Sequence, residues 1–514
     1  MCKKNQNDPN IEEFLDSFNS YFSLPSGSVE NCQISNESRN NKWFTIFDVT
    51  MKDPHPECPH CGNEVNSIHG YRDTLTVHNI MKNRNSEVRV HLRRYKCPAC
   101  RRTFTEPNPF TTRRRRISHE TIVSVLADLK KPQLSYTEIG RRHGLSATTV
   151  ASIFDTHVER KRLPLSEFMC IDENYAFKEG NSKYICLLVD FKTGEAIDVL
   201  PNRFKSQLIH YFKSIPAEER VKVKAIGTDM YRTYKEVIEE CFPKSTLVVV
   251  DRFHLVAEFG RQEDEVRLSV QRTFYKQLND LKRQISRLKE LPDFQSEHRQ
   301  EEFRKLLAQR KVLDDSYYLL KHFSWLLFKD STDKRFDINA PKQYNSHFKY
   351  EMNYYDIKKK LLSLDPALEE ADSLRSALTE LYTFESPEEG TEYFDEMVDL
   401  FRTSSVQTMR HFGLTLKHWR KEILNSLTIV DQIYEVQKDG RVTIRNRRLH
   451  NGVIERRNRD IKNMKNLANG FSNFDRFRNR VLYCLREDPS FSLDPAYESK
   501  AIKGLKKGRN GSKE

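Results

Sequence analysis

The sequence predicts a multidomain protein in which two small N-terminal modules precede a mixed α/β core and a long helical segment. Three observations indicate this fold class: two C-x-x-C pairs in residues 51–110, capped helix patterns in 111–163, and alternating strands and helices in 164–256. With 514 residues, the chain is long enough to form several domains with separate cores.

The composition favours a polyanionic partner, because the formal net charge is +13 with 31% charged residues. No apolar run approaches the roughly 20 residues that span a bilayer, and the N-terminus lacks the apolar stretch of a signal peptide. We therefore expect a cytoplasmic protein with no membrane partner. Its ten cysteines should then be reduced or metal-bound and not disulfide-paired.

Residues 1–50 predict a mostly polar N-terminal segment, and residues 51–110 predict a zinc-binding domain with strand-like pieces. Two C-x-x-C turns can direct four thiolates to one ion, which gives a closed structural Zn²⁺ site. The alternatives are four unrelated core cysteines or an iron–sulfur cluster, and the nearby His60 and His69 are expected to be surface residues. The proposed zinc ligands are Cys58, Cys61, Cys97 and Cys100.

Residues 111–163 predict a three-helix, helix-turn-helix DNA-binding domain. Ser118, Ser135 and Ser146 are suited to cap helices, Glu138 completes a capping-box pattern, and Gly144 ends the middle helix. The alternative is an ordinary helical packing unit with a charged surface. In the DNA-binding interpretation, the last helix enters the major groove and the arginines contact phosphates; the residues are Ser146, Thr148, Thr149, Arg113, Arg114, Arg115, Arg116, Arg141 and Arg142.

Acidic residues follow the apolar strands predicted in 164–256, the first part of the core. Asp172 follows "FMCI", Asp229 follows "VKAIGT" and Asp251 follows "STLVVV". A hairpin followed by a strand-helix-strand unit predicts a mixed sheet, in which the strands of Asp172 and Asp229 can be adjacent. Their carboxylates would then converge at one edge of the sheet.

A third carboxylate is available in the basic helix predicted near "HNGVIERRNRDIKNMKN", within residues 441–490. Glu455 lies about 100° around this helix from the apolar stripe of Ile454 and Ile461, so it flanks the buried face. The alternative for Glu455 is an ion pair with Arg459. Three carboxylates would complete a site for two hard divalent cations. Residues 257–440, between the two parts of the core, have a charged and helical pattern, and residues 491–514 form a basic tail.

The order of these motifs resembles that of bacterial insertion-sequence transposases of the ISL-three family. The resemblance rests on the two cysteine pairs, the helix-turn-helix pattern, "IDENYA", "GTDMYRTY", "VVDRFHLV" and, most specifically, "HNGVIERRNRDIKNMKNLANGFSNFDRFRNRVL". It implies an RNase H-like catalytic core, a catalytic Asp-Asp-Glu triad, and a helical insertion before the last part of the core. The insertion corresponds to residues 257–440.

The resemblance implies that the catalytic and metal-binding residues are Asp172, Asp229 and Glu455. Asp172 would be shared by two Mg²⁺ or Mn²⁺ ions, with Asp229 on one and Glu455 on the other. Asp251 is the chief alternative to Asp229, and Asp460 is a weaker alternative to Glu455. Asp251 is otherwise expected either to support the ligands from behind or to contact DNA near the site. His254 is expected to support the ligands from behind, and the residues expected to contact DNA are Arg456, Arg459 and Lys462.

The resemblance also implies an activity and partners. The enzyme would bind terminal inverted repeats in double-stranded DNA, cut at the transposon ends and join them to target DNA, as a homodimer associated with the bacterial nucleoid. Two other functions remain open from the sequence: a DNA-binding regulator with an inactive core, and a structure-selective nuclease.

Overall fold

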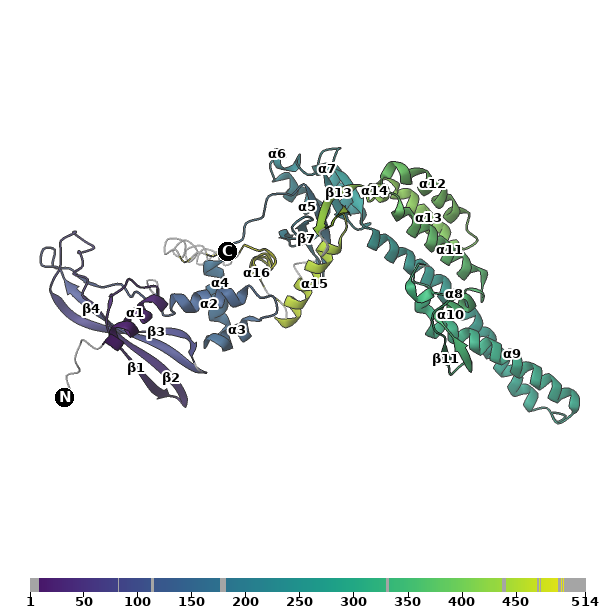
Figure 1. Ribbon diagram of the computed structural model, residues 1–514, viewed down its shortest axis with the longest axis horizontal. Helices are drawn as coiled ribbons and strands as arrows, with labels where there is room; N and C mark the ends of the chain where they lie inside the picture. Colours follow the sequence, from purple (N-terminus) through teal and green to yellow (C-terminus); the bar gives the residue numbers. More distant parts are fainter. Residues whose placement is uncertain are drawn as a thin grey trace, which may run out of the picture.

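The computed structural model describes residues 9–81, 83–111, 115–175, 182–329, 332–436, 441–468, 471, 473–488, 491 and 493. These residues form an elongated molecule (Figure 1). A sheet of long strands occupies one end, short helices and a second sheet occupy the middle, and long helices extend to the other end. The predictions for Arg113, Arg114 and most of the basic tail fall outside the described residues.

The N-terminal sheet is mixed. Its order is β1-β2-β4-β3, with β5 beside β4; β2 and β4 are parallel, and the other pairs are antiparallel. The elements are α1 (Pro9–Tyr21), β1 (Val29–Arg39), β2 (Lys42–Met51), β3 (Ile68–Met81), β4 (Arg84–Lys96) and β5 (Thr103–Thr105).

Residues 1–50 contribute more than the polar segment predicted for them, because β1 and β2 belong to the same sheet as β3 and β4. Phe18 of α1 and Phe22, the residue directly after α1, pack against Phe47 of β2, with ring centroids 6.0 and 6.4 Å away. Most of β1 is exposed, which explains why its sequence lacks an apolar strand pattern. The boundary expected at residue 50 therefore lies inside β2.

Three helices follow: α2 (His119–Leu129), α3 (Tyr136–His143) and α4 (Ala147–His157). The predicted caps are confirmed, since the hydroxyls of Ser118, Ser135 and Ser146 each accept a hydrogen bond from a backbone N–H in the first turn of a helix. Gly144 ends α3 in the left-handed region, at φ +68°. The capping box expected from Glu138 is not among the described contacts of α3, because the Glu138 carboxylate instead binds Arg141 and Arg142 of its own helix.

The central sheet has the order β10-β9-β6-β7-β8. The pairs β6–β7 and β7–β8 are antiparallel, whereas β6–β9 and β9–β10 are parallel. This confirms the expected mixed sheet and the hairpin that precedes the strand-helix-strand unit. Its strands are β6 (Phe168–Asn174), β7 (Ile185–Asp190), β8 (Ala196–Leu200), β9 (Ala225–Thr228) and β10 (Leu247–Val250).

Both faces of the central sheet are buried, because adjacent strand residues belong to different apolar cores. One face packs against Leu208 and Val237; the other packs against Ile454 and Val481. The first pair lies on α5 (Lys205–Lys213) and α7 (Arg232–Cys241); α6 (Ala217–Arg220) and β9 lie between these two helices in the chain. The second pair lies on α15 (Gly452–Leu467) and α16 (Phe474–Leu485).

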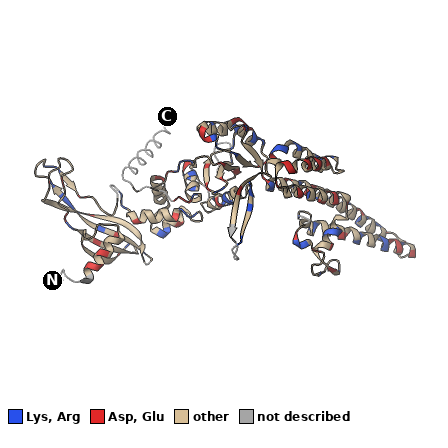
Figure 2. Ribbon diagram, turned by 45° about the horizontal axis from the view of Figure 1, so that its top comes forward, with Lys and Arg blue, Asp and Glu red and all other residues tan. Residues whose placement is uncertain are grey.

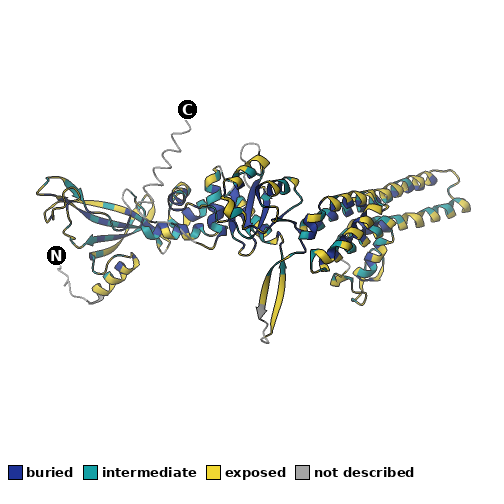
Figure 3. Cartoon of the chain, turned by 90° about the horizontal axis from the view of Figure 1, so that it is seen from above, coloured by how far each residue is buried: buried dark blue, intermediate teal, exposed yellow. Residues whose placement is uncertain are grey.

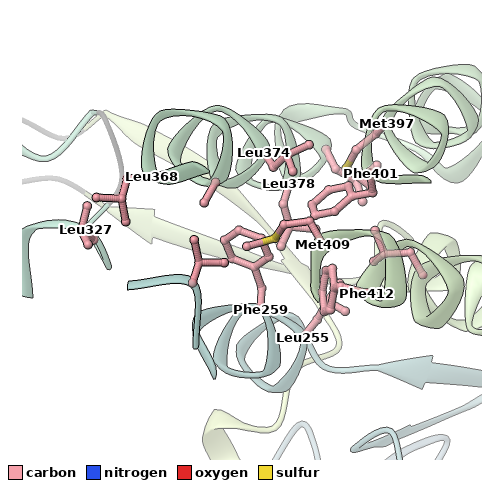
Figure 4. Close-up of a cluster of buried hydrophobic side chains, with 14 of the residues drawn as sticks. Leu255, Phe259, Leu327, Leu368, Leu374, Leu378, Met397, Phe401, Met409 and Phe412 are labelled. Atoms are coloured by element: carbon pink, nitrogen blue, oxygen red, sulfur yellow. The ribbon is translucent and has the colours of Figure 1, made fainter. Parts of the chain in front are cut away.

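The segment between β10 and β13 is mainly helical and has its own core. Phe259 of α8 contacts Phe401 and Phe412 at ring distances of 5.8 and 5.4 Å (Figure 4). Positive and negative residues are interspersed along α8 and α9 (Figure 2). The elements are α8 (Arg252–Lys289), α9 (Glu297–His322), η1 (Ser324–Leu326), η2 (Lys334–Phe336), β11 (Gln343–Asn345), β12 (Tyr350–Met352), α10 (Tyr354–Leu362), α11 (Pro366–Glu380), η3 (Leu381–Thr383), α12 (Pro387–Thr403), α13 (Gln407–His418) and α14 (Arg420–Asn425).

The end of the segment predicted as helical, 257–440, differs from expectation. The last helix ends at Asn425, and the chain continues into an antiparallel hairpin of β13 (Ile429–Val436) and β14 (Val442–Arg448). This hairpin projects from the body of the molecule with much of its surface exposed (Figure 3). Its alternating polar and apolar residues fit a two-stranded ribbon better than a helix. Across the described ranges, every helix is too short or too polar to traverse a lipid bilayer.

Candidate active site

Three acidic residues lie at one edge of the central sheet because β6, β9 and β10 run parallel and their carboxyl ends meet there. Asp172 lies near the end of β6, Asp229 directly follows β9, and Asp251 directly follows β10. Carboxylate oxygens of Asp172, Glu173 and Asp229 lie within 4.8 Å of one another. The parallel strands therefore bring together Asp172 and Asp229, the first two catalytic residues expected from the sequence.

Glu455 reaches the same edge from α15, whose buried side chains Ile454, Ile461 and Met464 pack on the sheet. Glu455 belongs to a second group there, in which its carboxylate oxygen, a carboxylate oxygen of Asp251 and a ring nitrogen of His254 lie within 4.8 Å of one another; the group of Asp172 and Asp229 does not include it. Glu455 Oε1 is buried without a hydrogen-bond partner. The position in the first turn of α15 is favourable for a negative charge, and an unpartnered buried oxygen is suited to a cation.

The start of α15 is held against the sheet by backbone contacts. The N–H of Asn451 donates to Asp251 Oδ1 at 3.0 Å, and Asp251 also caps α8 through the N–H of Phe253. Gly227 of β9 allows this approach, because a Cβ there would lie 3.2 Å from Asn451 Oδ1. Asp251 thereby connects the end of β10 to the start of α15, the helix that carries Glu455.

The sequence places Asn458 on the same side of the helix as Glu455, one turn later, but it does not indicate a contact with Asp172. Its Nδ2 donates to Asp172 Oδ2 at 2.8 Å, and Asn174 Nδ2 donates to Asn458 Oδ1 at 3.0 Å. Asn458 therefore orients a carboxylate on a different element. Its position three residues after Glu455 is the sequence feature that could have indicated it.

The electrostatics of the edge favour cation binding. Burial, followed by the charge of Asp229, raises the pKa of Asp172 to about 8, and the nearby Glu455 charge acts in the same direction. Burial also raises the pKa of Asp229 and that of Glu173. A divalent cation would relieve the repulsion between these carboxylates, and a set of oxygen donors suits Mg²⁺ or Mn²⁺.

Glu173 is already engaged by neighbouring residues. Arg203 binds its carboxylate at 2.5 Å, and the Tyr234 hydroxyl donates to it at 3.1 Å. The Arg203 guanidinium also lies 4.5 and 4.6 Å from the ring centroids of Tyr184 and Tyr231. Arg203 is a second residue that the sequence did not indicate, and its pairing leaves Asp172 and Asp229 as the less satisfied carboxylates of this group.

The basic side chains of α15 have different surroundings. Arg456, Arg459 and Lys462 are exposed, as DNA contacts require. Arg457 instead donates to the carbonyl of Gly194 in the β7–β8 turn and lies 3.7 Å from Asp460. Asp460 is thus directed to Arg457, away from the carboxylate groups described above.

The predicted DNA-binding residues of the three-helix segment are mostly accessible. Arg116, Arg141, Arg142, Ser146 and Thr148 are exposed, and Thr149 is half-buried. The pairs of Glu138 with Arg141 and Arg142 are exposed ion pairs, which contribute little stability and leave the arginines free to rearrange. The Arg115 guanidinium donates to Thr156, and the Ser146 hydroxyl is occupied in capping α4.

The four cysteines converge on one point. Cys58 Sγ lies 3.7 Å from Cys100 Sγ, and Cys61 Sγ lies 3.5 Å from Cys97 Sγ. Four sulfurs about 2.3 Å from a zinc ion would be about 3.8 Å apart in a tetrahedron. The donor set therefore fits Zn²⁺.

The two cysteine turns have matching backbones. Gly62 N–H donates to Cys58 O, and Arg101 N–H donates to Cys97 O, both at 2.9 Å. Gly62 and Arg101 both occupy the left-handed region, at φ +77° and +59°. The backbone N–H of Cys100 is the largest cause of the lowered pKa of Cys97, to about 7, which favours the thiolate that a metal requires.

The family comparison adds to this geometry. A family model described as a transposase, that of the ISL-three family, matches residues 169–349 and 342–481, from β6 to α16. The chain belongs to the ISL-three family of transposases. Its acidic edge lies within the matched region. The chain is also 29% identical over 103 residues to the transposase for insertion sequence element IS1001 of Bordetella parapertussis. That match covers 20% of this chain and spans about a quarter, 25%, of the relative's length.

Proposed function

We propose that this ISL-three-family chain is a DNA transposase that cuts transposon ends and joins them to target DNA through Asp172, Asp229 and Glu455. The observation that carries the proposal is that two groups of possible ligands lie at the carboxyl edge of one sheet: Asp172, Glu173 and Asp229 form one group, and Glu455 of α15 forms the other with Asp251 and His254. The family match covers all three residues. Burial raises the pKa of Asp172 and that of Asp229, so keeping both carboxylates charged is unfavourable unless cations neutralise them.

The central sheet supports an RNase H-like assignment for residues 164–256 and 441–490. That core is expected to begin with three antiparallel strands, here β6, β7 and β8. Two further strands, here β9 and β10, then lie on the other side of the first strand and run parallel to it. The helical insertion would enter after β10 and return before α15. In this division, the three-helix segment and the cysteine-containing sheet recognise the terminal inverted repeats, with one structural Zn²⁺ in the latter.

The chain's own residues would act as follows. Asp172 would bind both of two Mg²⁺ or Mn²⁺ ions, Asp229 one of them and Glu455 the other, while Asn458 keeps Asp172 oriented. Bound ions would lower the pKa of the attacking water or hydroxyl and stabilise the leaving oxygen. Asp251 would hold the first turn of α15, and so Glu455, in position.

DNA would be held by the positive side chains around this edge. Arg456, Arg459 and Lys462 would contact the phosphates near the cut, and α4 would enter the major groove of the repeat. Cutting and joining two ends together would require at least a homodimer on double-stranded DNA.

The test is a cleavage and joining assay with purified protein, Mg²⁺ and a duplex that carries the element's terminal repeat. Asp229→Asn and Glu455→Gln should abolish both cleavage and joining and leave repeat binding intact, because they remove metal ligands only. Asp460→Asn is the matched control on α15, since Asp460 pairs with Arg457. Full activity in the Asp229 and Glu455 variants would show that the site is elsewhere.

The same assay separates the other functions. Cleavage without joining, at DNA junctions irrespective of the repeat, would indicate a structure-selective nuclease. Repeat binding without Mg²⁺-dependent chemistry in the wild-type chain would indicate a regulator.

A further inference from the structure

Helix α16 lies between the three-helix segment and the central sheet, although it is more than 300 residues from α4 in the sequence. It contributes to two apolar cores. Tyr483 packs with Phe154 of α4, at a ring distance of 5.8 Å, whereas Phe477 and Val481 pack with the sheet. Figure 1 shows α16 beside α2 and α4.

Arg480 of α16 closes the end of α2. It is 2% exposed, and its guanidinium donates to the carbonyls of Leu129, Lys131 and Leu134, the last of these at 3.0 Å. These carbonyls belong to the last turn of α2 and to the connection into α3. A buried cation at the carboxyl end of a helix satisfies carbonyls that have no partner within the helix. The contact therefore fixes where α2 and α3 lie.

A second contact reaches α4 directly. Arg476 binds Asp155 of α4 through both Nε, at 2.9 Å, and Nη2, at 2.5 Å. The Tyr483 hydroxyl also donates to Leu126 O at 3.0 Å. A two-nitrogen arginine contact fixes direction as well as distance, so it orients the helix proposed to enter the DNA.

The other side of α16 is bound to β8 of the central sheet. Arg478 Nε donates to Asp198 Oδ1 at 2.7 Å. Just after the helix, Arg486 donates to the carbonyls of Ala196 and Ile197 at 2.8 and 2.7 Å. The same short helix and the residue after it thus bind the central sheet, α2, α4 and the connection into α3.

We propose that α16 sets the distance and angle between α4 and the acidic edge, and thereby selects the phosphate that is cut. This inference rests on the proposed function. Without α16, the direct connection from α4 to the central body would be residues 158–161, because Arg162 pairs with Glu219 and the N–H of Leu163 donates to Ile197 O. Four residues could span up to about 14 Å when extended. A displacement of about 1 Å at a reacting phosphate can cost about 100-fold in rate. Arg476, Arg480 and Asp155 are positioning residues in this scheme.

The test exchanges the charges of one contact. Asp155→Arg and Arg476→Asp should each repel across the α4–α16 interface, and the double variant should restore an ion pair. Each protein would first be bound to repeat-bearing duplex without metal. The cleavage reaction would then be started by adding Mg²⁺, and the position of the cut would be mapped at nucleotide resolution. We expect the single variants to bind the duplex but to cut more than about tenfold more slowly and at several neighbouring phosphates. The double variant should return most cutting to the original phosphate.

Two further variants complete the design. Arg480→Lys, which can reach fewer of the carbonyls, should also cut at neighbouring phosphates, but less often than the charge-reversal variants do. Asp475→Asn, on the exposed side of α16, is the control and should cut as the wild type does. Cutting by both single variants at the original phosphate and rate would overturn the inference, as would a double variant no better than the single ones. A wild-type chain that cuts no duplex would overturn the proposed function itself, a result distinct from scattered cutting.

Discussion

At the scale of single residues, Glu455 illustrates how surroundings decide the role of an acid in a basic stretch. Its side chain lies beside Asp251 and His254, with one buried oxygen that accepts no hydrogen bond. The expected alternative, an ion pair with Arg459, does not occur among the described contacts. Asn458, one turn later, supplies the amide that orients Asp172.

Asn458→Ala should lower metal-dependent DNA cleavage by about 10- to 100-fold, the usual cost of removing a residue that orients a metal ligand. Duplex binding without metal should not change, because Asn458 is directed at Asp172 and Asn174. The rate constant of cleavage in preformed complexes is the measurement. Asn463→Ala, on the exposed side of the same helix, is the control; equal activity of the two variants would contradict the role of Asn458.

The raised pKa of Asp172 predicts how pH and metal affect stability. Its folded pKa of about 8 lies above the usual value near 3.9. The neutral form of the Asp172 carboxyl therefore makes its whole contribution to the stability of the metal-free fold below about pH 4. This contribution is lost progressively as the pH rises to about 8. Mg²⁺ binds the charged form, so it should raise Tm more at about pH 8 than at about pH 6. Asp172→Asn should make the Mg²⁺ effect smaller and less dependent on pH; an unchanged dependence would contradict the assignment.

At the scale of elements, the cysteine turns join strands that are distant in sequence. One turn precedes β3, and the other connects β4 to β5, so a bound ion would link the two turns at the open end of the β3–β4 hairpin, where Ile68 pairs with Tyr95. Their matching hydrogen bonds and left-handed residues give both turns the same shape.

Cys97→Ser should abolish the binding of zinc and lower the thermal stability of the N-terminal sheet, because three remaining ligands hold the ion weakly. Metal content by mass spectrometry and Tm of the full chain are the measurements. Cys32→Ser provides the control, since Cys32 lies on β1 outside the cluster. Retention of a full equivalent of zinc by the Cys97 variant would rule out this ligand set.

At the scale of the whole molecule, the proposed recognition and catalytic parts lie at different places along an elongated chain (Figure 1). The net charge of +13 is distributed over this length, but positive and negative residues are interspersed along α8 and α9, so neither helix is uniformly positive (Figure 2). Binding to DNA should therefore depend on local arginines more than on the helical insertion.

Arg141→Ala should weaken duplex binding similarly for all sequences and reduce the slope of log K against log salt by about 1, as expected for the loss of one phosphate contact. Arg299→Ala on α9 provides a comparison at a site remote from α4, where Arg299 pairs with Glu302. Titrations at several salt concentrations supply the slopes, and equal slopes for wild type and Arg141→Ala would remove Arg141 from the contact surface.

Much of this organisation could be predicted from the sequence because it depends on local interactions. The serine caps, the turn at Gly144, the two cysteine turns and the strands that end in Asp172 and Asp229 involve residues close together in the chain. The convergence of the two aspartates follows from a general rule about parallel strands. The strands of residues 29–51 were not predicted from the sequence. The exposed β1 has no apolar alternation, whereas β2 buries Ile46, Phe47 and Val49, and this apolar stretch is the signal that could have indicated it.

The sequence by itself therefore determined the composition of the modules, the residues able to bind metal and the family of the chain. Only the tertiary structure decided that Glu455 lies beside Asp251 and His254, and that Asn458 contacts Asp172, a residue 286 positions away in the sequence. It also decided that α16 joins the three-helix segment to the central sheet. The physical reason is that side-chain contacts between distant elements depend on how the elements pack, and packing is a property of the whole chain.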